Sequence, residues 1–204
     1  MKESISYKAY LKPFLVYVFV IISILLMRIY VPWPYAVSAS AVLMLLMPHI
    51  MKSETAGDFG WDSRGVILGI IVTALLLAAY LLVLAGYGLY TSQSLTFQHL
   101  SVSFILMQLL LVAVPEEVFF RGYLQRVTGN DLKAVVIVSV LFALGHFVTL
   151  CLGGKHDISA CTKSVLTFFP SLVMGYLYMK TGSLWASIIF HFIANLVHVS
   201  AGLS

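Results

Sequence analysis

Long apolar runs, separated by short polar stretches, make up most of the chain. Each run is close to the roughly 17–25 residues that a helix needs to cross a bilayer. The pattern predicts seven spans, at about 13–31, 33–51, 65–89, 101–122, 133–150, 164–180 and 183–201. We therefore expect one all-α, polytopic membrane helix bundle over residues 1–204, with no room for a folded soluble domain.

The composition agrees with a membrane protein. Of the 204 residues, 61% are hydrophobic and 10% are charged, whereas globular domains have about 25% charged residues. The net charge of +4 does not indicate nucleic acid as a partner, because the 12 lysines and arginines are scattered at the ends of apolar runs. The first apolar run is followed by no small-residue cleavage site, so no removable signal peptide is expected.

Lysine and arginine are divided unevenly between the two sides of the predicted bundle. If the N-terminus is cytoplasmic, nine lie on the cytoplasmic side: Lys2, Lys8, Lys12, Lys52, Arg64, Arg121, Arg126, Lys133 and Lys180. Three lie on the opposite side: Arg28, Lys155 and Lys163. The positive-inside rule then favours an N-in, C-out orientation.

The two cysteines of the chain lie in one predicted loop, "CLGGKHDISAC". The N-in orientation places this loop on the oxidising side, where Cys151 and Cys161 are able to form a disulfide. Two alternatives remain at this stage: both cysteines are unpaired, or they form a three-ligand metal site with His156.

Two glutamates and an arginine stand within the hydrophobic stretch "AVPEEVFFRGYLQRV". Burying a charge in a membrane costs about 2.5–3.5 kcal/mol on insertion scales, so these groups are candidates for function. Glu117 and Arg121 have the four-residue spacing of a helical ion pair. Glu116 points about 100° away from Glu117. The spacing predicts that arginine neutralises Glu117 and leaves Glu116 free.

Pro115 directly precedes this pair. It has no N–H to donate to the carbonyl of Leu111, so we expect a kink in the helix. Proline kinks are common in membrane helices, but beside two glutamates a loosened backbone would also admit water.

Two other predicted spans carry polar side chains. His146 stands in "LFALGHFV" beside the small Gly145, and His191 and Asn195 in "IIFHFIANLVH" share one helix face because they are four residues apart. Three further histidines, near span ends or in loops, are expected to be structural: His49, His99 and His198.

The depths of these polar residues agree. At 1.5 Å per residue, Glu116 lies roughly 16 Å from the cytoplasmic end of its helix. His146, His191 and Asn195 lie roughly 20, 12 and 18 Å from the cytoplasmic ends of theirs. We therefore expect one polar cavity inside the membrane, opening toward the cytoplasm.

These residue types fit hydrolysis by an activated water molecule better than catalysis by a nucleophilic side chain. No serine or cysteine stands beside a histidine in a pattern typical of a catalytic triad. A carboxylate in a dry pocket is able to take a proton from water, and a histidine is able to orient that water or serve the leaving group. Asn195 and an imidazole N–H are able to hold an oxyanion. The set indicates peptide hydrolysis without a covalent intermediate.

Three ordered motifs carry a resemblance to a known family. "EEVFFR", "FALGH" and "HFIAN" resemble the EExxxR, FxxxH and HxxxN elements of the CPBP family of CAAX proteases and bacteriocin-processing enzymes. This family is also called Abi or type II CAAX endopeptidases, and the flanking "FRGYLQ" and "MKTGSLWASIIFHFIANL" resemble it too. The resemblance covers about Val112 to Val197 and implies an intramembrane endopeptidase similar to the Ras and a-factor converting enzyme.

The resemblance also implies roles for the site residues. Glu116 would be the general base, and His146 its partner on the water molecule. His191 and Asn195 would form the oxyanion hole.

Glu117 and Arg121 would support the site or bind substrate. No cofactor is expected, because no HExxH-type helical pair is present. The alternative is a zinc-dependent enzyme with Glu116, His146 and His191 as ligands.

Several questions stay open from the sequence. Residues 1–100 carry no motif, whereas 101–204 would form the catalytic core. The substrate would be a membrane-associated protein or peptide, with a CAAX-like, sorting-signal or bacteriocin-type sequence, in a bacterial or archaeal cytoplasmic membrane. The oligomeric state is left open. Alternatives are a small proton-coupled transporter, a non-catalytic immunity protein, or polar residues that only bond helices together.

Overall fold

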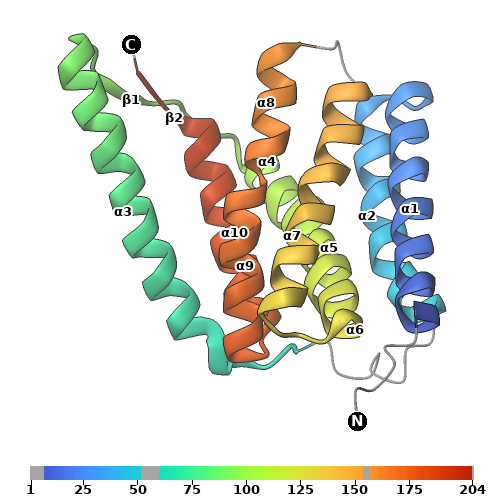
Figure 1. The fold of residues 1–204 in the computed structure, drawn as a ribbon. Helices are drawn as coiled ribbons and strands as arrows, with labels where there is room; N and C mark the ends of the chain where they lie inside the picture. The colour runs from blue at the N-terminus through green and yellow to red at the C-terminus, as the bar shows by residue number, and fades with distance from the viewer. Residues whose placement is uncertain (1–6, 52–59, 154–156, 204) are drawn as a thin grey trace.

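The computed structural model describes residues 7–51, 60–153 and 157–203, which fold as a bundle of long helices (Figure 1). Within this part of the chain, six helical stretches are long and apolar enough to cross a membrane, and Leu184–Ser200 is a shorter apolar helix. The chain is therefore an integral multi-pass membrane protein with an all-α fold. Four residues used above lie outside the described residues: Lys2, Lys52, Lys155 and His156.

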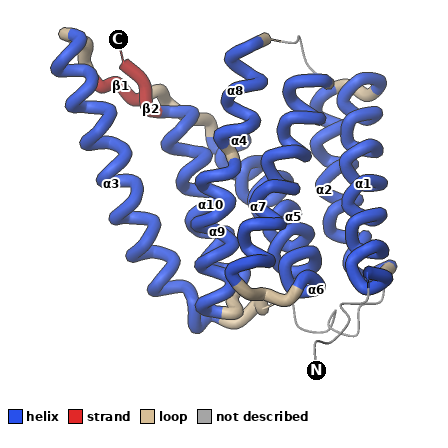
Figure 2. Tube along the Cα trace, in the orientation of Figure 1, coloured by secondary structure: helices blue, strands red, loops and turns tan. Residues whose placement is uncertain are grey.

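The bundle begins with α1 (Tyr7–Tyr30), α2 (Trp33–Ile50), the short 3-10 turn η1 (Ser63–Gly65) and α3 (Val66–Thr91). The fourth long helix is built from α4 (Val102–Met107), the π-helical η2 (Gln108–Ala113), α5 (Val114–Glu117), the π-helical η3 (Val118–Gln125) and α6 (Arg126–Thr128). It is followed by α7 (Leu132–His146), the π-helical η4 (Phe147–Leu152), α8 (Ile158–Leu166), α9 (Phe168–Thr181) and α10 (Leu184–Ser200). Two short strands, β1 (Leu95–Phe97) and β2 (Ala201–Leu203), pair antiparallel (Figure 2).

Successive long helices run in opposite directions, so the start of α1 and the end of α10 lie at opposite ends of the bundle (Figure 1). We call the end that holds the start of α1 the N-terminal face. The end that holds the last turn of α10 is the C-terminal face. Every prediction about depth in the membrane can be expressed relative to these two faces.

The predicted spans are confirmed to within a few residues, with three exceptions. The first helix already begins at Tyr7 instead of 13. The fourth helix continues to Thr128 instead of ending at 122, because its polar residues Arg121 and Gln125 are buried in protein and not in water. The sixth span begins earlier, at Ile158, and is broken after Leu166. Pro170 explains the break, because it has no N–H for the carbonyl of Leu166 and favours the first turn of a new helix.

An aromatic core fills the half of the bundle nearest the N-terminal face. It includes Tyr17 of α1, Phe119, Phe120 and Tyr123 of η3, and Phe142 of α7, all at most 6% exposed. Phe120 packs edge-on against Phe142 with ring centroids 4.9 Å apart. The hydroxyl of Tyr17 donates to the carbonyl of Leu141 at 2.7 Å. These contacts fix α1, the fourth helix and α7 against one another below the glutamates.

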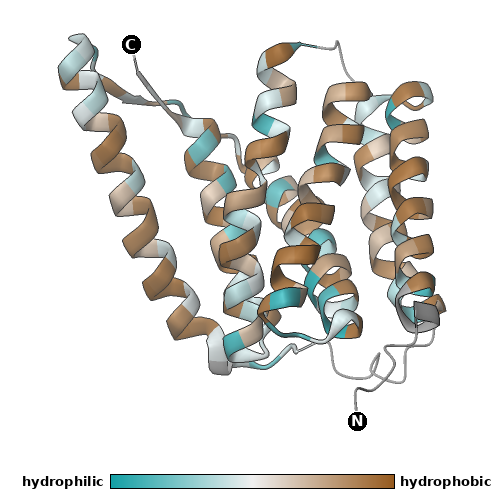
Figure 3. Cartoon of the chain, viewed as in Figure 1, coloured by the Kyte–Doolittle hydropathy of each residue, from teal (hydrophilic) through white to brown (hydrophobic). Residues whose placement is uncertain are grey.

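The outermost helix, α3, contacts the bundle mainly through α10. Gly69 permits this approach, since a Cβ atom there would come within 2.8 Å of the Cα of Ala186. Most of α3 is apolar and faces outward (Figure 3). The pairing of β1 with β2 holds its far end to the end of α10.

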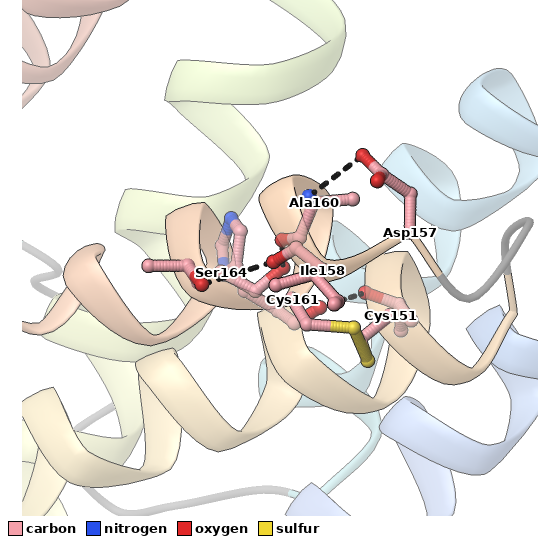
Figure 4. Close-up of a disulfide and its surroundings, with 9 residues drawn as sticks. Cys151, Asp157, Ile158, Ala160, Cys161 and Ser164 are labelled. Atoms are coloured by element: carbon pink, nitrogen blue, oxygen red, sulfur yellow. Dashed lines mark hydrogen bonds between the residues drawn. A yellow bond between two sulfur atoms is a disulfide. The ribbon is translucent and has the colours of Figure 1, made fainter.

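Cys151 and Cys161 form a disulfide that joins η4 to α8 (Figure 4). Asp157 caps α8, since its carboxylate accepts from the N–H of Ala160. Because both sulfur atoms are bonded to each other, neither is left as a thiolate ligand. The alternative three-ligand metal site with His156 is therefore wrong.

Candidate active site

The two glutamates lie on α5, a short α-helical segment between two π-helical segments. Pro115 is its second residue and lacks the N–H that a regular helix would use. The predicted irregularity is present in the form of π-helical hydrogen bonding in η2 and η3. Such π-type segments are often found at functional sites, because they redirect the side chains around them.

Glu117 is the centre of a buried ionic network. Its Oε1 accepts from Nη1 of Arg121 at 3.1 Å, and both side chains are fully buried. Nη2 of Arg121 donates to the hydroxyl of Ser171 at 2.8 Å and to its carbonyl at 3.1 Å. The guanidinium also lies 4.9 Å from the ring centre of Phe142, a favourable cation–π distance. The predicted ion pair is therefore present, and it joins the fourth helix to α9.

The same carboxylate fixes His191 of α10. Nδ1 of His191 lies 2.8 Å from Oε1 of Glu117, and the ring is 6% exposed. A carboxylate only accepts, so Nδ1 carries the proton and donates it. This bond turns Nε2 toward Glu116, whose Oε2 lies 3.8 Å away.

His146 approaches Glu116 from the other side. Its Nδ1 lies 3.0 Å from the carbonyl of Phe142, one helical turn earlier, so Nδ1 donates there as well. Its Nε2 lies 3.9 Å from Oε2 of Glu116. Glu116 and His146 are 14% and 22% exposed, and Oε2 of Glu116 has no hydrogen-bond partner among the described residues. The predicted gathering of one free carboxylate and two imidazoles is present.

Asn195 lies one turn beyond His191 and is paired with a residue that the sequence analysis missed. Its Nδ2 donates to Oε1 of Gln108 at 3.2 Å. Gln108 is the first residue of η2. Its sequence signal was its isolation, since it is the only amide in the uncharged run Ser101–Val114. One N–H of the Asn195 amide remains for another acceptor.

A cavity of about 400 Å³ lies beside these residues, and the buried His191 is not part of its lining. Its lining includes Gln108, Glu116, His146 and Asn195. Residues of α1 and α2 form much of the remaining wall, among them Ile21, Ile24, Ser40 and Met44. The first 100 residues carry no motif, but two of their helices complete the chamber around the motif residues.

The cavity extends toward the C-terminal face. Beyond Glu116 and His146 it is lined by four residues near the C-terminal face: Arg28, Trp33, Gly153 and His198. The expected N-in orientation and the expected opening toward the cytoplasm therefore exclude one another, because the aromatic core and the buried Arg121 fill the side of the N-terminal face. Spacing along the helices gave the depth of the site, but it carried no information on which half of the bundle large side chains would fill.

The three histidines assigned a structural role lie apart from the two at the centre. His49 is in the last turn of α2, and His99 follows β1. His198 is exposed and lines the outer part of the cavity. It therefore contacts the same space as the site, about two turns from His191.

The zinc alternative requires three ligands around one point. Among the residues that the structure describes, no three histidine, cysteine, aspartate or glutamate side chains are arranged to hold a metal ion together. The choice between a metal-free enzyme and zinc held by Glu116, His146 and His191 is left to the chelation experiment described below.

A carboxylate and an imidazole on the wall of a cavity inside a membrane bundle, with a second imidazole buried beside the carboxylate, are typical of one class of protein, the intramembrane hydrolases. The family comparison is more specific. Residues 97–197 match the family model described as type II CAAX prenyl endopeptidase Rce1-like, and through this segment the chain belongs to that family. The protein is therefore an intramembrane peptidase, and the resemblance seen in the three motifs is confirmed. No curated protein and no solved structure matches the chain significantly.

Proposed function

We propose that the protein hydrolyses a peptide bond of a membrane-associated protein or peptide with a water molecule that Glu116 activates. One observation carries the proposal. Oε2 of Glu116 lies 3.9 and 3.8 Å from Nε2 of His146 and of His191. These gaps are too long for direct hydrogen bonds, and Oε2 is a buried acceptor without a partner among the described residues, which a small movement of either ring would open to a water molecule.

The reaction follows from the positions of these groups. Glu116 takes a proton from the water, and the hydroxide bonds to the carbonyl carbon of the substrate. Asn195 donates its remaining N–H to the resulting oxyanion, and His191 donates from Nε2 when that atom is protonated. Glu116 then gives its proton to the leaving nitrogen as the C–N bond breaks. The products are a carboxyl group and an amine.

Glu117 and Arg121 support this site and do not bind substrate in the proposal. Both side chains are 0% exposed, so a substrate in the cavity has no access to them. Their function is to hold the ring of His191, since Glu117 accepts from its Nδ1. A histidine whose second nitrogen is fixed by a carboxylate keeps its tautomer and its orientation.

Glu116→Gln tests the base assignment. Glutamine has nearly the same shape but takes no proton, and loss of a general base lowers rates by about 10²–10⁴-fold. We expect the variant to be folded, because Oε2 of Glu116 has no hydrogen-bond partner to lose among the described residues. Quantitative proteomics of membranes from wild-type and variant cells should show an uncut membrane-linked substrate that accumulates in the variant.

Lys133→Gln provides the control for this comparison. Lys133 is an exposed residue in the first turn of α7, far from the cavity. Its proteome should match wild type. Once the substrate is identified, purified Glu116→Gln protein that cleaves it at the wild-type rate would exclude Glu116 as the base.

Removal of metal separates the glutamate mechanism from the zinc alternative. We expect the purified enzyme to cleave its substrate after dialysis against a chelator, with less than one equivalent of bound metal by elemental analysis. Activity that is lost on chelation and restored specifically by zinc would contradict the metal-free mechanism and would return Glu116, His146 and His191 as candidate ligands.

A further inference from the structure

The direction of the cavity identifies the face from which substrate arrives. At the level of the site, α1 lies beside α7. A Cβ atom at Gly145, next to His146, would lie 2.9 Å from Cδ1 of Ile21. Arg28, Gly153 and His198 line the outer cavity. They follow Ile21, His146 and His191 by seven positions each. Seven helical residues correspond to roughly 10 Å. The cavity therefore runs about two turns from the site toward the C-terminal face.

The opposite direction is closed by packing. Directly below the glutamates, Arg121, Phe119 and Phe120 are at most 2% exposed. The residues packed here belong to the core cluster that joins α1, η3 and α7. A polypeptide segment has no path to Glu116 through this half of the bundle in the described structure.

The disulfide lies on the same side as the outer cavity. Cys151 belongs to η4, between the cavity residues Leu150 and Gly153. Disulfides persist in oxidising compartments and are rare in the cytosol. The face into which the cavity extends is therefore expected to be the extracytoplasmic one.

The distribution of charge gives the same answer independently. Among the described residues, the N-terminal face holds Lys12, Arg126, Lys133 and Lys180, and the C-terminal face holds Arg28 and Lys163. The positive-inside rule places the more basic face in the cytoplasm. Disulfide and charge thus agree on the orientation.

We infer that the substrate reaches Glu116 from the outer face of the membrane, through the opening bounded by Arg28, Trp33, Gly153 and His198. The inference rests on the proposed function, because the proposed hydrolysis defines what the substrate is. It assigns the substrate class: a membrane-associated protein or peptide whose cleaved segment lies on the extracytoplasmic side. A segment confined to the cytoplasm would meet the closed half of the bundle.

Cysteine labelling tests this without any substrate. The two native cysteines are paired and leave no free thiol among the described residues. Val37→Cys places a thiol on the cavity wall of α2. Val42→Cys, on the same helix, is 53% exposed but outside the cavity, and Lys133→Cys marks the N-terminal face. The probe is a small, charged, membrane-impermeant methanethiosulfonate, applied to right-side-out and to inverted membrane vesicles.

We expect Val37→Cys to react in right-side-out vesicles and Lys133→Cys to react only in inverted ones. Val37→Cys should react at least tenfold faster than Val42→Cys, because a thiol in contact with lipid does not ionise readily. Reaction of Val37→Cys only from the side that labels Lys133→Cys would overturn the inference. So would equal rates at positions 37 and 42, or labelling of position 37 only in inverted vesicles.

The labelling result and the proposed function fail separately. Labelling requires an open cavity but no catalysis, whereas the comparison of wild type with Glu116→Gln requires catalysis but no particular face. If hydrolysis is wrong and the face is right, the labelling pattern stays as expected while the two proteomes are the same.

Discussion

At the scale of single residues, Glu116 and Glu117 show how one peptide bond separates two roles. A helix turns 100° per residue, so the two carboxylates face different surroundings. Glu117 is 0% exposed and bonded to Arg121 and His191, whereas Glu116 is 14% exposed and faces the cavity. The first has compensated charge and the second is open to reaction. The ion pair could be predicted from the spacing, but its third and fourth partners could not.

Arg121→Met should destabilise the protein by about 3–5 kcal/mol, because it leaves the buried carboxylate of Glu117 without its cation. The double variant Glu117→Leu with Arg121→Met should be less destabilised than the single one, since no buried charge remains uncompensated. Unfolding of purified protein by SDS titration in mixed micelles measures both. A single variant as stable as wild type would contradict the proposed structural role of the pair.

Ser171→Ala separates charge from hydrogen bonding in the same network. It removes the hydroxyl that accepts from Nη2 of Arg121 at 2.8 Å but keeps the carbonyl that accepts at 3.1 Å. The expected loss in the same titration is about 1–3 kcal/mol, smaller than that of Arg121→Met. Equal losses would mean that the hydroxyl, and not the charge, dominates the network.

At the scale of elements, the π-helical segments could not be predicted from the sequence. The length of the apolar runs predicted each helix, and the common depth of Glu116, His146 and His191 predicted the site. The side chain of Gln108 meets Asn195 at the start of η2, however, and no rule of spacing along a regular helix relates residues 87 positions apart. Such contacts depend on how the helices pack against one another, and this packing cannot be predicted from a single sequence.

The disulfide joins the cavity wall on η4 to α8, and its removal should loosen this pair of elements. For a loop closed over ten residues, the chain-entropy estimate is about 2–3 kcal/mol. We therefore expect Cys161→Ser to lower the melting temperature, and reduction of wild type to lower it equally. Thr162→Ser, an exposed conservative change on the same helix, is the control. Identical melting of the two variants would mean that the disulfide does not stabilise the fold.

At the scale of the whole molecule, the sequence determined the number of helices and the layer of the site but not the way the bundle is closed. The spans followed from the length of apolar runs, which the thickness of the bilayer fixes. The side of the opening depended on where Phe119, Phe120 and Phe142 pack, and it lies toward the C-terminal face, which an N-in orientation with a cytoplasmic opening does not allow. Large side chains below the site and smaller residues above it, such as Gly145, Thr149 and Gly153, give the cavity its direction.

The orientation of the whole chain leads to the last prediction. Seven crossings would place the two termini on opposite sides of the membrane, but α10 has only 17 residues, or about 25 Å, against a hydrocarbon core of about 30 Å. The seventh crossing is therefore the one to test. A reporter fused after Ser204 should be extracytoplasmic, and the same reporter fused after Gly182, before α10, should be cytoplasmic.

The reporter pair should be one protein that is active only outside the cytoplasm and one that fluoresces only inside it. Opposite results for the two fusion points would show that α10 spans the bilayer, which its buried residues Leu184, Ile188 and His191 favour because they pack against the bundle and not on its surface. The same result for both points would mean six crossings. The last turn of α10 would then lie within the membrane, and the cavity opening beside His198 would face lipid instead of water.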